Sequence, residues 1–148
     1  MHSHKELQKT LKEQLEEFST KNDCRWETSA EKHIDPPVTP GSRRIDVAVD
    51  TNQEYQKGYA IEIKTINSEG YLLLGQLRDA LIAGFRPVLV APDSFFDKTL
   101  PHTPDVPLNW ATDMLSTSLV TSTDSNPPDF RIVEDRLRVD DDLHPFFQ

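Results

Sequence analysis

Two short stretches of alternating apolar and polar residues constrain this chain more than any other feature. The first covers residues 44–50, the second covers residues 59–65, and a polar segment ending in Gly58 joins them. The apolar side of the first consists of Ile45, Val47 and Val49, and that of the second of Ile61 and Ile63. Alternation with a period of two is typical of a strand with one buried face, and two such strands joined by a polar, Gly-containing connection form a hairpin. The sequence therefore predicts a β-hairpin here.

Other elements flank this hairpin. Before it, the sequence predicts an amphipathic helix over 4–19 with Ser3 as its N-cap, a strand over 24–34 and a Pro/Gly loop over 35–42. After it come a helix over 71–83, closed by Gly84, and an apolar strand over 86–92 that is buried on both faces. Weaker patterns predict a helix over 108–119 and short strands over 119–122, 131–133 and 137–139. This order predicts an α/β fold around one sheet, in a single domain over 1–148.

Charge and hydropathy limit the function classes. The 148-residue chain has a net charge of −9, and its acidic excess lies mostly from about residue 93 onward, because residues 90–148 hold 4 Lys and Arg against 11 Asp and Glu. An acidic surface opposes tight binding to nucleic acid but does not affect local chemistry. No apolar run approaches the roughly 20 residues of a membrane span, and no signal-peptide pattern is present. We therefore expect a soluble, cytoplasmic protein with no membrane partner.

Three charged residues of the hairpin are predicted to lie together. If Ile61 and Ile63 face the core, Glu62 and Lys64 project from the opposite face of their strand, and pairing of the strands brings Asp46 beside them. A half-exposed sheet with ordinary cross-strand ion pairs would show the same spacing. The apolar neighbours, however, indicate central strands, where solvated charges are unusual. We therefore interpret the three residues as a candidate active site.

The pattern resembles a known family. An Asp in one strand, followed about fifteen residues later by Glu-x-Lys in the next, resembles the PD-(D/E)XK nuclease superfamily, which includes restriction endonucleases, archaeal Holliday-junction resolvases and RecB-type nuclease domains. Gln76 lies early in the following helix, where many members place a Gln. The resemblance covers roughly residues 5 to 92. Two positions depart from the pattern, because Ile45 replaces the usual Pro and Ala80 stands where RecB-type members have Tyr.

This resemblance implies a restriction-endonuclease-like core and a chemistry. Asp46 and Glu62 would bind Mg²⁺, or Mn²⁺ in its place, and Lys64 would aid the attacking water. A Glu from the first helix would join the metal site; Glu6 is our choice, although Glu13, Glu16 and Glu17 compete. Gln76 would position a water or a phosphate oxygen. Arg43, Arg44 and Arg78 are candidates for contacts to a nucleic-acid backbone.

The leading hypothesis is thus a metal-dependent nuclease acting on DNA. One alternative is a catalytically silent domain of the same fold that binds nucleic acid or protein, which the acidic charge favours. Another is an unrelated α/β protein whose hairpin carries an ion pair. Because members of this superfamily often act as dimers, the resemblance also allows a homodimer.

Overall fold

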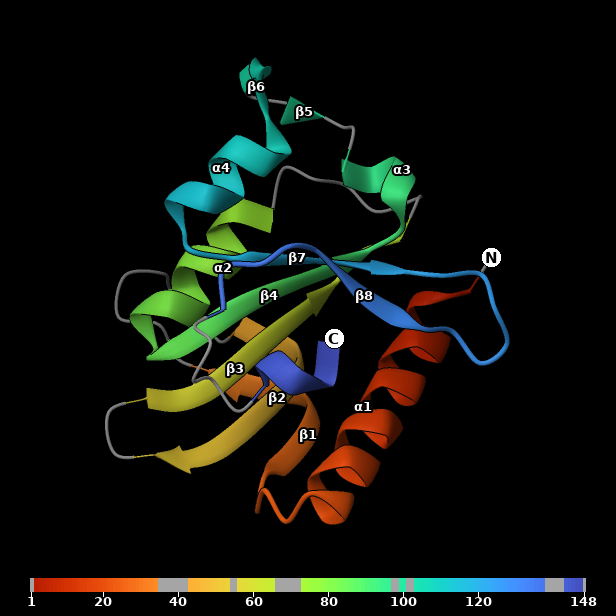
Figure 1. Ribbon diagram of the computed structural model, residues 1–148. Coiled ribbons are helices and arrows are strands. Elements are labelled where there is room, and N and C mark those ends of the chain that lie inside the picture. The colour runs from red at the N-terminus through yellow and green to blue at the C-terminus, as the bar shows by residue number, and fades with distance from the viewer. Residues whose placement is uncertain are drawn as a thin grey trace.

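The computed structural model describes residues 2–34, 43–53, 56–65, 73–96, 99–100, 103–137 and 143–147 (Figure 1). The loop predicted over 35–42 lies outside these residues. The helices are α1 (His4–Lys21), α2 (Leu73–Ile82), α3 (Asp93–Phe96), α4 (Leu108–Met114) and the 3-10 helix η1 (His144–Phe147). The strands are β1 (Glu27–Ile34), β2 (Arg43–Gln53), β3 (Gln56–Ile63), β4 (Phe85–Ala91), β5 (Thr99–Leu100), β6 (Thr103–Pro107), β7 (Ser118–Ser122) and β8 (Phe130–Glu134).

A six-stranded mixed sheet organises these elements, in the order β1-β2-β3-β4-β7-β8. The strands β1, β2 and β3 pair antiparallel, β3, β4 and β7 pair parallel, and β8 is antiparallel to β7. The predicted α/β class and the predicted β2–β3 hairpin are therefore confirmed. The strands β5 and β6 form a separate two-stranded ribbon, which lies beyond α4 in Figure 1.

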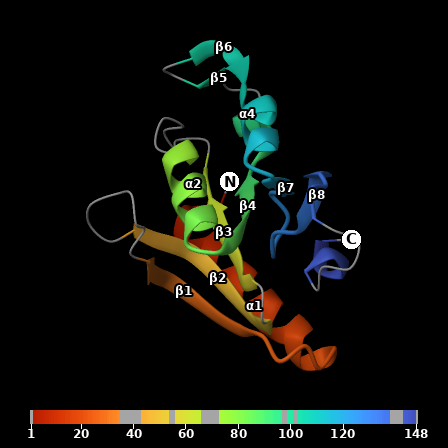
Figure 2. The same ribbon diagram turned by 90° about the vertical axis from the view of Figure 1, so that its left-hand side faces the viewer.

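Helices cover both faces of the sheet. On one face, α1 packs its buried stripe of Leu7, Leu11 and Leu15 against the sheet, beside Phe147 of η1. On the other face, Leu73 and Leu77 of α2 join residues of β4 and β7 in a second core cluster. Figures 1 and 2 show α2 and α4 on the side of the sheet opposite α1. Every residue of β4 except Arg86 is buried, as predicted for a strand covered on both faces. No helix among the described residues has the length and apolar character that a membrane crossing requires.

The hairpin strands follow the predicted alternation with one exception. Val47, Val49, Ile61 and Ile63 all pack in the cluster beneath α1. Ile45 was predicted on that same face, but it packs with residues on the α2 side of the sheet. A gap in the pairing of β1 with β2 explains why Ile45 faces the other side. The β1–β2 register lacks a pair between Ala30–Val47 and Lys32–Ile45, and Glu31, which stands at this gap, has a left-handed φ of +53°. The strict alternation of side chains is lost at this break.

Gly58, which ends the predicted polar connection, permits the close approach of β2 and β3. Its φ is +145°, and a Cβ atom at this position would lie 1.8 Å from the carbonyl oxygen of Val49. Every residue other than glycine carries that atom. Gly84 ends α2 with a φ of +97°, in agreement with its predicted role.

The acidic region beyond residue 93 completes the fold. It supplies β7 and β8 to the sheet and the buried Leu137, Leu143 and Phe147 to the core beneath α1. The helix predicted over 108–119 is shorter than expected, because Ser116 adopts a left-handed φ of +52° and the chain turns there into β7. The strand predicted over 137–139 is wrong at Leu137, which lies in no strand, and its other residues are outside the described part of the chain.

Candidate functional site

Asp46 and Glu62 lie together where β2 and β3 stop pairing. The last pair of this ladder on the side of the site is Val47–Ile61. Beyond it, Oδ2 of Asp46 accepts the backbone amide hydrogen of Ile63 at 2.8 Å, so a side chain rather than the backbone links the two strands. Glu62 is only 2% exposed, and the Asp46 side chain is 16% exposed. The hairpin therefore places two carboxyl groups side by side in a nearly dry part of the sheet.

This closeness affects the protonation of both groups. Burial, followed by the charge of Asp46 and a hydrogen bond between the two carboxyls, raises the pKa of Glu62 well above its ordinary value. Burial alone would raise the pKa of Asp46 as well, but hydrogen bonds from His4 and from the Ile63 amide outweigh it and lower that pKa. Without a bound cation, Glu62 thus retains its proton more strongly than an exposed Glu.

One oxygen of the pair lacks a partner among the described residues. Oε2 of Glu62 is buried and accepts no hydrogen bond from that part of the chain. A buried polar atom without a partner costs free energy, and in native proteins it commonly indicates an absent ion or water. Carboxylate oxygens are also the ligands that Mg²⁺ prefers. The pair therefore fits a small divalent cation in its chemistry.

The residue of α1 that reaches this pair is His4, not the predicted Glu6. Nε2 of His4 lies 3.3 Å from Oδ2 of Asp46. This contact, ahead of an opposing effect of burial, raises the pKa of His4. The carboxylate of Glu6 instead contacts Nδ1 of His2 at 3.1 Å, and its backbone amide donates to the N-cap Ser3. Helix α1 therefore contributes an imidazole to the site, where the resemblance implied a carboxylate.

Gln8 and Glu31 were not predicted, yet both support the site. Nε2 of Gln8 donates to the backbone carbonyl of Asp46 at 2.8 Å and to Oε1 of Glu31 at 3.1 Å. Gln8 thus satisfies the backbone of Asp46 at the position where the β1–β2 ladder is interrupted. Glu31 stands opposite Asp46 in that register, and its charge contributes to the raised pKa of Glu62. The signal for Gln8 was a polar residue on the buried stripe of α1.

Lys64 and Gln76 meet on the α2 side of the sheet. Nζ of Lys64 donates to Oε1 of Gln76 at 2.8 Å. The backbone of Lys64 is held as well, because its amide donates to the carbonyl of Val90 in β4. Lys64 also lies close enough to Glu62 for its charge to oppose the rise in the pKa of that carboxyl. The predicted grouping of Lys64 with Glu62 and Gln76 is therefore present in the structure.

Two of the three predicted arginines, Arg44 and Arg78, have described side chains, whereas the side chain of Arg43 lies outside the described residues. Arg44 is exposed on β2 opposite His33. Nη2 of Arg78 lies 3.3 Å from Oδ1 of its neighbour Asp79, which is fully buried, while Arg78 itself is exposed. Of the two, Arg44 is the nearer to Asp46 along the chain, two residues before it.

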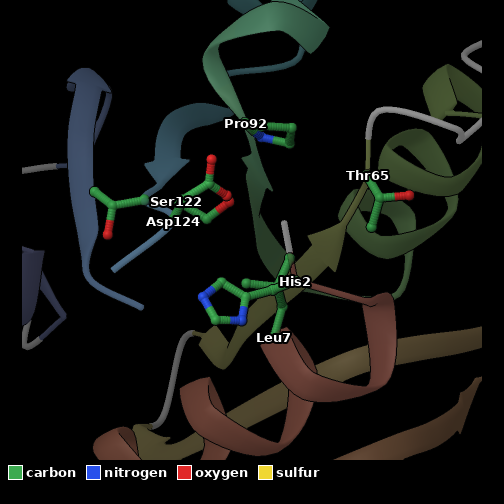
Figure 3. A pocket seen from close by; sticks show the side chains of 7 residues that line it. His2, Leu7, Thr65, Pro92, Ser122 and Asp124 are labelled. Carbon is green, nitrogen blue, oxygen red and sulfur yellow. The ribbon is translucent and has the colours of Figure 1, made fainter. Parts of the chain in front are cut away.

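A small cavity opens beside the N-terminus of α1, at the carboxyl ends of the parallel strands (Figure 3). His2, Leu7, Thr65, Pro92, Ser122 and Asp124 line it, and Thr65 directly follows Lys64. Its volume of about 20 Å³ suits a single water molecule rather than a nucleotide. The cavity borders the candidate site but does not contain it.

Neither a metal cluster nor a relative identifies the site. Among the described residues, no group of three or more His, Cys, Asp and Glu side chains is arranged to hold a metal ion. No protein-family model, no curated protein and no solved structure matches this chain. The functional assignment therefore depends on the geometry around Asp46, Glu62 and Lys64.

Proposed function

We propose that this protein hydrolyses phosphodiester bonds in DNA with the help of a divalent cation, Mg²⁺ or Mn²⁺. The observation that carries this proposal is the buried carboxyl pair of Asp46 and Glu62, which lies beside Lys64 and in which Oε2 of Glu62 has no partner among the described residues. Like charges are costly at such a place unless a cation joins them. The restriction-endonuclease-like core, the homodimer and the cytoplasmic location stay predictions.

Each residue of the site has a role in this proposal. Asp46 and Glu62 would hold the cation. A cation there would lower the pKa of the attacking water and stabilise negative charge on the phosphate. Lys64 donates to an oxygen of the reacting phosphate or to the attacking water, and Gln76 holds the Lys64 ammonium group in place. His4 and the Ile63 amide orient Asp46. Arg44 is available for a contact to the DNA backbone.

The test is cleavage of a labelled panel of duplex, single-stranded, flap and junction DNA, with Mg²⁺, with Mn²⁺ and with EDTA. We expect metal-dependent cleavage by the wild type and a loss of about 10²–10³-fold in rate for Asp46→Ala and for Lys64→Ala. Glu134→Gln, an exposed change on β8, serves as the control and should cleave like the wild type. Intact folding is checked by circular dichroism. Equal cleavage by wild type and Asp46→Ala would refute the proposed site.

A catalytically silent domain is the second candidate. Two observations favour it: the imidazole of His4 already contacts Asp46, and no third acidic or histidine donor completes a metal group among the described residues. In that case wild type would bind DNA or a protein without cutting the panel under either metal. The cleavage test therefore separates the two functions.

A further inference from the structure

A second, larger groove lies on the α2 side of the sheet. Lys32 and His33 of β1 line it from one side, and Lys57 and Phe85 line it from the other. Exposed Ile82, at the end of α2, forms part of its rim. The volume of the groove is about 710 Å³, which lies in the range of ligand-binding sites. It is therefore large enough to hold part of a polymer.

Two ammonium groups converge in this groove. Nζ of Lys32 lies 5.5 Å from the centre of the Phe85 ring, and Nζ of Lys57 lies 5.8 Å from it. Within the described residues neither ammonium forms an ion pair with a carboxylate, and Asp50 is the one acidic residue that lines the groove. In a chain with a net charge of −9, such a concentration of positive charge is unusual. The groove therefore favours an anionic occupant.

The groove lies on the same face of the sheet as Glu62. Phe85 packs in one cluster with Ala60, which lies two residues before Glu62 on β3 and therefore on the same face. Phe85 pairs with Gly58 and Leu89 pairs with Glu62, so Phe85 lies roughly 13 Å from the site along β4. Lys32 is nearer to the site, because it pairs across the ladder with Ile45, the residue before Asp46. A DNA strand whose phosphate is held between Asp46 and Glu62 would thus reach the groove along this face.

We propose that this groove binds backbone phosphates of the DNA strand next to the bond that is cut, an inference that rests on the proposed function. Lysine ammonium groups bind phosphates as point charges and carry no base specificity. The Phe85 ring is only 3% exposed beneath the two lysines, so it offers no free face for stacking with a base. The groove therefore increases affinity without selecting sequence.

The test measures binding separately from cleavage. The full-length wild type and the double variant Lys32→Ala/Lys57→Ala are titrated in EDTA against fluorescent DNA strands and duplexes of two unrelated sequences, at several salt concentrations. Each lost phosphate contact should lower the slope of log affinity against log salt by about 1, and the affinity by about tenfold at 0.1 M salt. The double variant should therefore bind about 100-fold more weakly to both sequences.

Matched controls exclude a general effect of charge. Lys9→Ala/Lys21→Ala removes the same charge from exposed positions of α1, on the opposite side of the sheet, and should change affinity less than twofold, about the scatter expected for distant charges. An unchanged salt slope in the groove variant would overturn the proposal, and so would the absence of DNA binding by the wild type. Equally tight binding of polyglutamate by the wild type, lost in the groove variant, would overturn it in favour of an acidic protein partner.

Failure of the groove and failure of the proposed function give different results. Cleavage that depends on Asp46, together with an unchanged salt slope in the groove variant, would refute only the groove. Binding that depends on Lys32 and Lys57, without cleavage by the wild type under either metal, would refute only the nuclease.

Discussion

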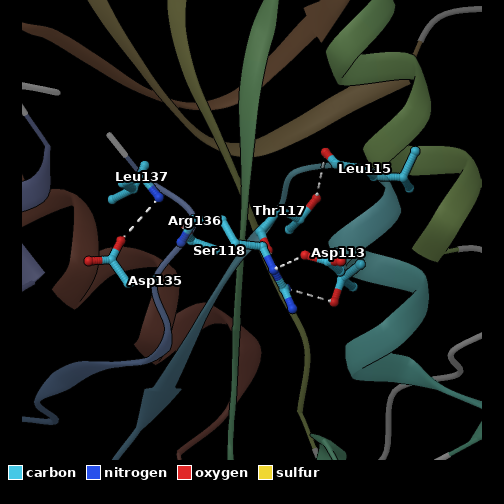
Figure 4. A network of polar contacts seen from close by, with 8 residues as sticks. Asp113, Leu115, Thr117, Ser118, Asp135, Arg136 and Leu137 are labelled. Carbon is cyan, nitrogen blue, oxygen red and sulfur yellow. Dashed lines mark hydrogen bonds and ion pairs between the residues drawn. The ribbon is translucent and has the colours of Figure 1, made fainter. Parts of the chain in front are cut away.

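Two largely buried polar clusters in this protein differ in the charges that they bring together. Around Arg136, just after β8, a positive charge meets acceptors (Figure 4). Its Nε donates to Oδ1 of Asp113 at 3.0 Å, and Nη1 donates to the Thr117 carbonyl at 2.7 Å and to the Thr112 hydroxyl at 3.2 Å. Around Asp46, by contrast, a second carboxyl group, that of Glu62, lies close by, and Oε2 of Glu62 has no hydrogen-bond partner among the described residues.

The difference indicates what each cluster contributes. The Arg136 cluster joins the segment after β8 to α4 and to the start of β7, and its opposite charges stabilise that arrangement without any added group. In the Asp46–Glu62 pair, burial and the charge of Asp46 raise the pKa of Glu62 well above its ordinary value, so ionisation of Glu62 costs stability. Groups held in an unfavourable state by the rest of a fold are common at functional sites. The first cluster therefore serves stability, and the second is suited to binding.

The largest effect on stability should come from Arg136. We expect Arg136→Met to lower the free energy of unfolding by about 2–3 kcal/mol, because the buried Thr112 hydroxyl and Thr117 carbonyl lose a charged donor. Arg131→Met is the matched control, since that side chain is 70% exposed and its ion pair with Asp129 spans 3.8 Å. It should cost less than about 0.5 kcal/mol. Urea denaturation measures both, and equal costs would contradict the role assigned to Arg136.

A substitution of Glu62, in the other cluster, should raise the free energy of unfolding instead of lowering it. We expect Glu62→Gln to raise the free energy of unfolding by about 1–2 kcal/mol at pH 8 in EDTA, because it removes a buried carboxylate but keeps its shape. The pKa of Glu62 is raised in the folded protein, so the unfolded chain releases this proton at lower pH. Wild-type stability therefore falls as the pH rises above the ordinary value of 4.5, and the advantage of the variant grows from pH 5 to pH 8.

Mg²⁺ should affect the stability of the wild type and of Glu62→Gln differently. Mg²⁺ should raise the melting temperature of the wild type but not that of Glu62→Gln, because a ligand stabilises only the form that binds it. Glu134→Gln, an exposed change on β8, is the control and should leave both the stability and the Mg²⁺ response unchanged. A Glu62→Gln protein that is less stable than wild type at pH 8 would show that the pair is a stabilising element.

The smallest effect should come from His4. Its pKa is raised by Asp46, so its contribution is fully present below its ordinary value of 6.5 and is lost as the pH rises through the raised pKa. The pKa of Asp46 is lowered, so its contribution is present above 3.8 and is lost as the pH falls through the lowered value. His4→Gln should therefore cost stability mainly between about pH 4 and pH 6.5, by less than about 1 kcal/mol because the ring is partly exposed. A cost that does not change between pH 5 and pH 9 would contradict this.

Local pattern predicted the part of the site that lies on one strand. The alternation of Ile61, Glu62, Ile63 and Lys64 predicts which side chains share a face, whereas Gln76 came from the resemblance to the nuclease superfamily. His4 was missed in favour of Glu6 because the choice depends on how α1 docks on the sheet, which no local periodicity encodes. Glu31 was missed because only the register between β1 and β2 places it opposite Asp46.

The same limit applies to the fold. Residues up to 92 carry the clearer patterns, and a helix or strand lies at each predicted place among the described residues. The face of Ile45 differs, and so do two strand ends, because β1 begins at Glu27 and β3 ends at Ile63. The change of face at Ile45 arises at a left-handed residue in another strand, more than ten positions away. The cluster around Arg136 joins α4, β7 and the segment after β8 through hydrogen bonds between distant residues, so no local pattern could indicate it.

The alternation along β3 has a consequence for how this protein can change over evolutionary time. Ile61 and Ile63 of β3 fill the core, while Glu62 and Lys64, which directly follows the strand, belong to the candidate site, so one short segment encodes both in alternate positions. Insertion or deletion of one residue there would exchange the two sets, with charges entering the core and isoleucines entering the site. We therefore expect descendants of this gene to keep the length of this segment and to vary in length in the connections between elements.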